Sequence, residues 1–151
     1  PKEKKVFKRL SFFTPDTAYQ VRAAFSANRS PDTLYLKTNT GDKSAEVVYG
    51  NLYFNLKGES FELPVYRAVD ASDDYLFLPF SDQTNGVSSY GGGRYIDLTY
   101  PLADTITLDF NKAYNPYCAY NPKYSCPLVP PQNFLDTEIF AGERAFELFQ
   151  K

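Results

Sequence analysis

Short segments that alternate apolar and polar residues recur along this chain, and they limit its fold more than any other feature does. Such alternation is typical of half-buried β-strands, because successive side chains of a strand point to opposite faces of the sheet. Strands are predicted at 19–25, 33–39, 46–56, 60–68, 75–80, 94–100, 105–110 and 135–141. No amphipathic stretch is long enough to supply a helical layer. We therefore expect an all-β fold, either an antiparallel β-sandwich or a partly open β-barrel, with at most a short closing helix over 143–149.

Glycines and prolines predict where these strands bend, turn or lie at an edge. Gly50 interrupts the longest segment and predicts a bulge or a bend. Lys57 and Gly58 predict a hairpin turn. Pro64 lacks the N–H that a sheet ladder uses, so its strand is expected at an edge or with a bulge at that residue. The segment 75–80, YLFLPF, is apolar on both faces and is therefore expected at the centre of the sheet.

The length and charge of the chain limit its organisation and its partners. Its 151 residues fit one domain, 1–151, and five of the first nine are basic, so residues 1–10 are expected to form a basic N-terminal extension. The formal net charge of −2 provides no basic surface for nucleic acid. No apolar run reaches the length that spans a bilayer as a transmembrane segment. The sequence indicates no oligomeric state.

Histidine is absent, which excludes several kinds of catalytic site. A Ser-His-Asp triad, a Cys-His pair and a His-containing zinc site cannot form within this chain. The two cysteines are also too few for the four ligands of a structural zinc site. Any general base must be Asp, Glu, Lys or Tyr, and neither a metal centre nor a cofactor is predicted.

The unusual residues concentrate in the stretch 77–133. Seven of the thirteen tyrosines and both cysteines lie between Tyr90 and Pro131. Prolines limit the backbone freedom of the second half of this stretch, so a long, ordered loop rich in Pro and Tyr is expected there. These prolines are Pro116, Pro122, Pro127, Pro130 and Pro131.

Two turns early in this stretch have both a structural and a functional interpretation. The turn DQTNG, which contains Asp82 and Asn85, supplies oxygens that could hold Ca²⁺ or a polar ligand, or it is closed by its own side chains. The glycines 91–93 precede Arg94 without the spacing of a phosphate-binding loop. Their backbone N–H groups and Arg94 could face an anion, or they form a tight turn beside a structural arginine.

Polar and aromatic residues continue into the long loop. Asp109, Asn111 and Asn115 either hold the irregular backbone of the loop together or belong to a ligand cup. In the second interpretation the tyrosines from Tyr114 to Tyr120 give the cup aromatic walls with polar tips. The candidate ligand-binding residues are Asp82, Asn85, Tyr90, Arg94, Tyr95, Asp109, Asn111, Tyr114 and Asn115.

Cys118 and Cys126 close a short loop if they are oxidised. The disulfide would then stabilise the fold by about 2 to 3 kcal/mol. If they are reduced, they are paired thiols or buried apolar packing, or Cys118 is a nucleophile that no histidine activates. The sequence leaves these alternatives open.

Four blocks carry a family resemblance: FLPFSDQTNGVSSYGGGRYIDL, DFNKAYNPYCAYN, CPLVPPQN and the AGE at 141–143. They resemble an uncharacterised bacterial family that is known only as a domain of unknown function. The resemblance implies no activity and no catalytic residue. It implies the same residue types at Asp82, Asn85, Tyr90, Arg94, Tyr95, Asp97, Asp109, Asn111, Tyr114, Asn115, Cys118, Cys126, Asn133 and Glu143. Many relatives resemble exported proteins, so a location in the periplasm or cell envelope is expected, with a leader that precedes this chain; a cytoplasmic location stays open.

Three interpretations of function remain. The first is a binding module that takes a small polar or anionic ligand in a pocket lined by Tyr90, Tyr95, Tyr114 and Arg94. The second is a hydrolase that uses Asp82 or Asp109 as its base, with or without a divalent cation. The third is a structural or interaction domain in which the same residues only lock the long loop.

Overall fold

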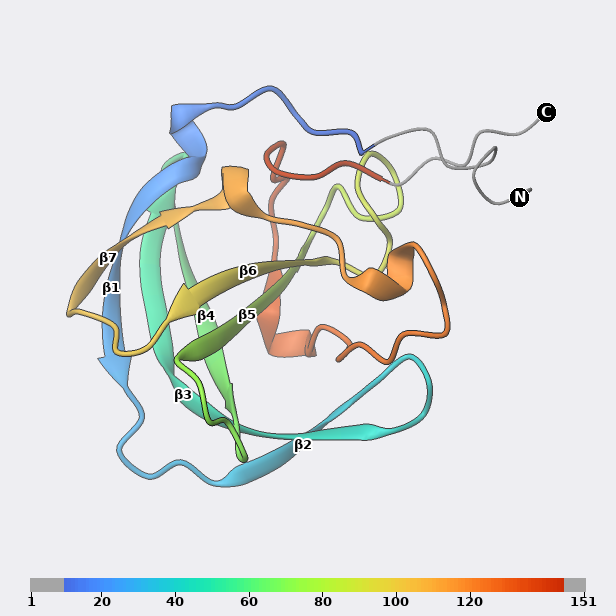
Figure 1. Cartoon of the computed structure of the whole chain (residues 1–151). Helices are drawn as coiled ribbons and strands as arrows, with labels where there is room; N and C mark the ends of the chain where they lie inside the picture. Colours follow the sequence, from blue (N-terminus) through green and yellow to red (C-terminus); the bar gives the residue numbers. More distant parts are fainter. Residues whose placement is uncertain (1–9, 146–151) are drawn as a thin grey trace.

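One sheet, curled into a half-barrel, forms the body of the protein in the computed structural model, which describes residues 10–145 (Figure 1). Six antiparallel strands cross it in the order β6, β5, β4, β3, β1 and β7, while β2 pairs with β3 and the short β8 pairs with β5 in parallel. The partly open barrel expected from the alternating segments is confirmed, and the alternative of a two-sheet sandwich is wrong.

The strand boundaries are close to the predicted ones for the first seven strands. The strands are β1 (Gln20–Ala27), β2 (Thr33–Lys37), β3 (Lys43–Leu56), β4 (Glu59–Ala68), β5 (Tyr75–Asp82), β6 (Arg94–Thr99), β7 (Thr105–Asp109) and β8 (Phe134–Leu135). The described helices are short 3₁₀ turns: η1 (Thr17–Tyr19), η2 (Phe110–Lys112), η3 (Tyr117–Ala119) and η4 (Pro131–Asn133). Between residues 10 and 145, none of these turns has the length or the apolar character needed to cross a membrane.

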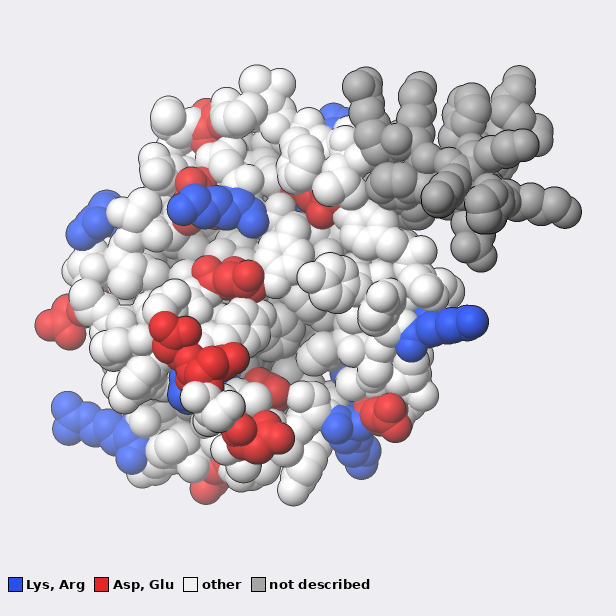
Figure 2. All heavy atoms as spheres, viewed as in Figure 1, with Lys and Arg blue, Asp and Glu red and all other residues white. Residues whose placement is uncertain are grey.

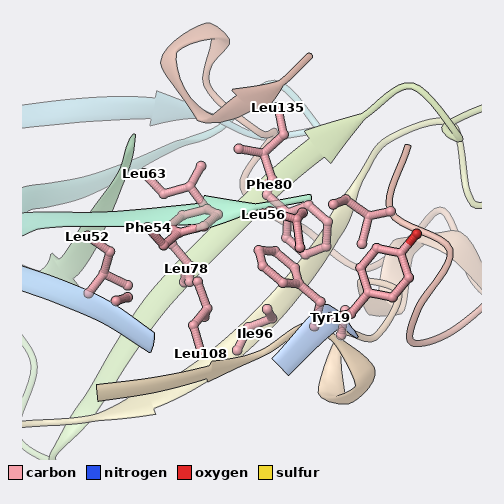
Figure 3. Close-up of a cluster of buried hydrophobic side chains, with 14 of the residues drawn as sticks. Tyr19, Leu52, Phe54, Leu56, Leu63, Leu78, Phe80, Ile96, Leu108 and Leu135 are labelled. Carbon is pink, nitrogen blue, oxygen red and sulfur yellow. The ribbon is translucent and has the colours of Figure 1, made fainter. Parts of the chain in front are cut away.

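The inside of the half-barrel holds the main hydrophobic core (Figure 3). Alternate residues of each strand point into it, because the pleat of a strand sends successive side chains to opposite faces. β5 is buried on both faces from Leu76 to Phe80, which confirms its predicted central place. Labelled members of this core are Tyr19, Leu52, Phe54, Leu56, Leu63, Leu78, Phe80, Ile96, Leu108 and Leu135.

A bulge in β3 lets this one strand serve two cores. Val48 pairs with Tyr66 of β4, whereas Gly50 pairs with the next residue, Val65, so β3 carries one extra residue, Tyr49. The predicted irregularity at Gly50 is confirmed. A Cβ at this glycine would lie 2.4 Å from a backbone oxygen of β1, so only glycine fits. Because side chains alternate along a strand, the extra residue moves the even-numbered side chains of β3 from one face of the sheet to the other.

The second core lies on the outer face of the sheet. Its buried members are Leu36, Tyr66, Phe77 and Tyr95. β2 and the loop after β7 flank it, and backbone hydrogen bonds join the two: the N–H of Leu128 donates to the oxygen of Lys37 at 2.8 Å, and that of Asn39 donates to Cys126 at 3.2 Å. The Pro- and Tyr-rich loop is therefore tied to the sheet.

The expectation for Pro64 is wrong, because β4 lies between β3 and β5 and pairs regularly with β3 at this residue. The ladder between β4 and β5 is instead reduced to the single pair of Tyr66 and Phe77. Buried Asn133 fills the gap beside this pair. Its Nδ2 donates to the oxygens of Pro64 at 3.0 Å and Pro79 at 2.8 Å, and its Oδ1 accepts from the Tyr66 hydroxyl at 2.8 Å. A proline is thus tolerated inside the sheet because a side chain completes the hydrogen bonding that the ladder lacks.

The end of the chain differs from the sequence prediction. The strand predicted at 135–141 is wrong beyond Leu135, because β8 has only two residues. The described part of the predicted helix 143–149 is not helical, since Glu143 forms an isolated β-bridge with Phe12. Residues 146–149 of that helix, and residues 1–9 of the predicted N-terminal extension, lie outside the described residues.

Replacing Asn133 by alanine is expected to lower the free energy of unfolding by about 3 kcal/mol, because it removes three hydrogen bonds, two of them buried and one part-buried. Urea denaturation followed by circular dichroism measures the effect. Asn121→Ala is the matched control, since this asparagine is exposed and caps only a loop N–H. Equal denaturation midpoints for Asn133→Ala and the unaltered protein would show that Asn133 does not hold β4 against β5.

Candidate functional site

Arg94 is the most completely buried of the predicted site residues, with 0% of its side chain exposed. Its Nη1 donates to the oxygens of Ala141 and Glu143, and its Nη2 donates to Ile139 at 3.0 Å and to Oδ1 of Asp82 at 3.3 Å. Asp82 in turn accepts from the N–H of Ile139 at 2.8 Å. Burial lowers the pKa of Arg94, and the charge of Asp82 opposes that shift. The ion pair therefore fixes residues 139–143, which we call the C-terminal latch. Neither side chain of the pair faces solvent.

The turn that follows Asp82 is closed by its own side chains. Thr84 Oγ1 donates to Asp82 Oδ2 at 2.7 Å, and Asn85 Nδ2 donates to Asp82 Oδ1 at 3.2 Å and to Ser89 Oγ at 2.8 Å. Gly93 has a φ of +88°, and a Cβ there would lie 2.7 Å from the Phe80 oxygen, so this glycine is required by close backbone contact. Both turns thus fit the structural interpretation. Among residues 10–145, no group of three or more Cys, Asp or Glu side chains is arranged to hold a metal ion.

Asp109 and Asn111 form a separate cluster at the start of the long loop. Asp109 caps η2 by accepting from the N–H of Asn111 at 3.0 Å. The Asn111 side chain exchanges two hydrogen bonds with the backbone of Asp16, at 3.0 and 2.9 Å. These residues join the loop to the segment before β1, and they lie apart from the Arg94 centre.

Asn115 is bonded to the C-terminal latch and to the residue that follows it. Its N–H donates to Oε1 of Glu143 at 2.8 Å, and its Nδ2 donates to the oxygen of Arg144 at 3.0 Å. The Tyr120 hydroxyl donates to Oε2 of the same glutamate. Burial, followed by this hydrogen bond, raises the pKa of Tyr120 above its usual range. Glu143 is only 3% exposed and acts as the acceptor that anchors the loop to the latch.

Cys118 and Cys126 are both free, so of the alternatives left open by the sequence the disulfide is wrong for this structure. They nevertheless lie together: the N–H of Cys118 donates to Sγ of Cys126 at 3.3 Å. Burial raises the pKa of the Cys118 thiol to about 11, and the neighbouring thiol adds to the shift. Tyr90 contacts Cys118 by its hydroxyl. The alternatives of paired thiols and buried packing fit this geometry better than a nucleophile does, because a nucleophilic cysteine needs a lowered pKa.

Tyr95 and Tyr114, from the candidate ligand-binding residues, and Tyr117, from the predicted aromatic walls of the cup, line an open hollow, which we call the tyrosine groove. It has a volume of about 460 Å³. Its walls are Tyr75, Tyr95, Asp97, Tyr114, Pro116, Tyr117, Ser125, Cys126 and Pro127. The Tyr114 hydroxyl donates to Asp97, and the Tyr95 hydroxyl donates to the Pro127 oxygen, so these rings are held in place. Burial is the main cause that raises the pKa of both tyrosines, and they are therefore neutral at physiological pH.

A smaller hollow of about 160 Å³, which we call the Glu46 pocket, adjoins the groove and shares three of its walls. Its walls are Glu46, Ala68, Tyr75, Phe77, Tyr95 and Pro127. Burial, the largest cause, and the charge of Asp70 raise the pKa of Glu46, while a hydrogen bond from Ser44 lowers it. Glu46, Tyr75 and Phe77 were not among the predicted site residues. For Tyr75 and Phe77 the alternation carried a signal, because odd-numbered residues of β5 and β6 share the outer face.

The charge around these hollows is negative. Asp97 and Glu46 are the charged residues in their walls, and neither lining contains Lys or Arg. Figure 2 shows a group of carboxylates to the left of and below the centre of the face in view, where Figure 1 places the turn between β4 and β5. That turn contributes Asp70, Asp73 and Asp74. The arrangement suits a ligand that is neutral or positively charged.

Replacing Arg94 by alanine is expected to lower the free energy of unfolding by about 3 to 5 kcal/mol, because it leaves Asp82 as a buried charge without its partner. Urea denaturation measures the loss. Arg22→Ala is the control, since exposed Arg22 makes one side-chain hydrogen bond among residues 10–145, to the Thr107 hydroxyl, and its loss should change stability little. An Arg94→Ala variant as stable as the unaltered protein would contradict the structural role of this arginine.

Cys118 is expected to react slowly with iodoacetamide at pH 8, because its raised pKa keeps the thiol protonated. Its alkylation rate should keep rising up to about pH 11, whereas an ordinary thiol with a pKa near 8.5 levels off earlier. Mass spectrometry of the intact chain measures the rates, with the urea-unfolded protein as control. A rate that already levels off below pH 8 in the folded protein would show an activated thiolate.

The similarity of this chain to other proteins extends over nearly its whole length. Residues 5–144 match the family described as "Protein of unknown function (DUF1684)". A solution NMR structure of an uncharacterized protein from Haloarcula marismortui resembles it with a TM-score of 0.77 and 42% identity, over 95% of this chain and 80% of that chain. No curated protein matches. The bacterial origin expected from the resemblance stays a prediction. From the half-barrel fold and this match, the chain belongs to the DUF1684 family of proteins of unknown function.

Proposed function

We propose that this protein binds a small polar molecule and that the tyrosine groove is the binding site. The observation that carries the proposal is a hollow of about 460 Å³ whose walls combine aromatic rings with a few polar tips. Small-molecule sites usually have this composition and a volume of a few hundred Å³. The rings of Tyr95 and Tyr114 meet edge to face with centroids 6.0 Å apart, so the walls are preorganised.

The ligand that fits this groove is neutral or cationic, and the anionic alternative has little support. Arg94 was the predicted partner for an anion. It is instead buried, with hydrogen bonds to the C-terminal latch, and it lines neither hollow. Asp97 at the groove would repel an anion. The polar tips of Asp97, Tyr117 and Ser125 instead offer acceptors and hydroxyls for hydrogen bonds with the ligand.

The hydrolase alternative receives less support from the geometry than binding does. Asp82 is shared between Arg94 and Thr84, and Asp109 caps a 3₁₀ turn, so neither predicted base lines the groove. Asp97 lines it but already accepts a hydrogen bond from Tyr114. A general base must reach the proton that it removes, and these carboxylates have other partners.

Replacing Tyr117 by alanine is expected to weaken binding of a groove ligand by up to about tenfold, because it removes an aromatic wall. Tyr117 is 70% exposed, so the fold should persist. Ligands are first found in a library of neutral and cationic metabolites by thermal shift, and binding is then measured by chemical-shift changes in ¹H–¹⁵N spectra of the full chain.

Tyr35→Ala is the matched control, since Tyr35 on β2 is also mainly exposed but belongs to neither hollow. It should leave the affinity unchanged. Ligands that bind the unaltered protein and Tyr117→Ala equally well would place the site elsewhere. A library without any ligand whose chemical-shift changes map to the groove would count against a binding function.

A further inference from the structure

Glu46 has fewer hydrogen-bond donors than the other buried carboxylates of the described residues. It is 5% exposed and, like Glu143, forms no salt bridge among those residues, but Glu143 accepts from both the Asn115 N–H and the Tyr120 hydroxyl. The Ser44 hydroxyl donates to Oε2 of Glu46 at 2.7 Å and is its only hydrogen-bond donor among the described residues. A buried carboxylate without a counter-charge carries a large desolvation penalty. Such a group needs either a structural partner or a ligand to explain it.

The neighbouring strands give Glu46 no polar partner at its own position in the sheet. Glu46 pairs with Leu34 of β2 on one side and with Ala68 of β4 on the other. Both neighbours are apolar, so a valine or leucine would suit this place in a sheet equally well. The bulge at Tyr49 turns this part of β3 toward the outer face, and the carboxylate lines the Glu46 pocket.

Aromatic rings form the walls of the pocket around this carboxylate. The rings of Phe77 and Tyr95 meet edge to face, with centroids 4.6 Å apart and an interplanar angle of 87°. The Tyr75 ring lies 6.4 Å from that of Phe77 at an angle of 35°. Rings at such different angles form a corner in which a cation can lie close to more than one π-face. The volume of about 160 Å³ is close to that of a cavity which holds a benzene molecule, roughly 150 Å³.

The hydrogen-bonding capacity of the pocket distinguishes between kinds of cation. A primary ammonium group carries three donors that each need an acceptor. Glu46 is the only carboxylate in the pocket walls, and the Tyr95 hydroxyl already donates to the Pro127 oxygen. An alkylated ammonium has few or no N–H groups, so aromatic faces and one carboxylate satisfy it fully.

We propose that the Glu46 pocket binds a quaternary ammonium group, with the carboxylate of Glu46 as counter-charge and Tyr75, Phe77 and Tyr95 as an aromatic cage. The remainder of the ligand then extends into the tyrosine groove, which shares Tyr75, Tyr95 and Pro127 with the pocket. This inference rests on the proposed binding function and adds the chemical class of the ligand. The acidic turn between β4 and β5, with Asp70 acting on Glu46, favours the approach of a cation.

The test is a titration of the full chain with choline, followed in ¹H–¹⁵N spectra. Choline is expected to shift the amide signals of Tyr75, Phe77 and Tyr95. Its uncharged carbon analogue, 3,3-dimethyl-1-butanol, has the same shape and should bind at least about tenfold more weakly, because it lacks the cation–π and ionic attraction. Glu46→Gln should weaken choline binding by a similar factor. Glu62→Gln removes the same charge from an exposed position on β4 and should leave choline binding unchanged.

The stability of Glu46→Gln provides a second, independent readout. Because the substitution removes a buried charge without an ion-pair partner, the thermal midpoint should stay the same or rise. A lower midpoint would assign Glu46 a structural role and overturn the inference. Equal affinities of choline for Glu46→Gln and the unaltered protein, or equal affinities for choline and its uncharged analogue, would also overturn it. If choline does not bind but another ligand depends on Tyr117, only the ammonium inference fails; if neither binds, the groove proposal fails too.

Discussion

The ion pair between Arg94 and Asp82 is the interaction on which the rest of the structure depends most. A half-barrel has an open side, and here residues 139–143 pack Ile139 and Ala141 into its core without forming a strand. A segment without a ladder still has backbone groups that need hydrogen bonds. Arg94 supplies donors to three of its carbonyls, and Asp82 accepts from one of its N–H groups. The buried ion pair thus provides residues 139–143 with hydrogen bonds that a neighbouring strand would otherwise supply.

The same centre shows why a buried ion pair can be retained in a hydrophobic core. Two charges removed from water are costly, and their attraction alone often does not offset that cost. Here Nη1 and Nη2 of Arg94 and Oδ2 of Asp82 also bond to the latch, although Nε of Arg94 has no partner among the described residues. Phe80 places its ring 5.1 Å from the guanidinium carbon, which adds a cation–π contact. The pair therefore specifies where residues 139–143 lie.

The sequence allowed the strands to be predicted well and the site poorly, for one physical reason. Strand periodicity is local, so the seven long strands and the bulge at Gly50 could be predicted without knowledge of their neighbours. Predicting the candidate site also required knowing which face of the sheet each side chain occupies. Arg94 and Tyr95 are adjacent in sequence, yet the pleat sends one into the core and the other to the outer cluster. Residues concentrated in one stretch were therefore divided between the latch, the η2 cap and the tyrosine groove.

Glu46 could not have been found from the sequence, because its surroundings come from other strands. Its face depends on the bulge, and its aromatic neighbours belong to β5 and β6. A comparison with Arg94 shows why the burial of Glu46 needs an explanation outside the fold. Arg94 and Asp82 are buried and hold a segment of the chain in place, so the fold itself explains them. Glu46 is buried, holds no segment in place and borders a hollow of about 160 Å³. Stability alone would not retain such a charge, since an apolar residue at this position of the sheet would avoid the desolvation penalty. The charge that the fold does not explain is therefore the one that points to a ligand.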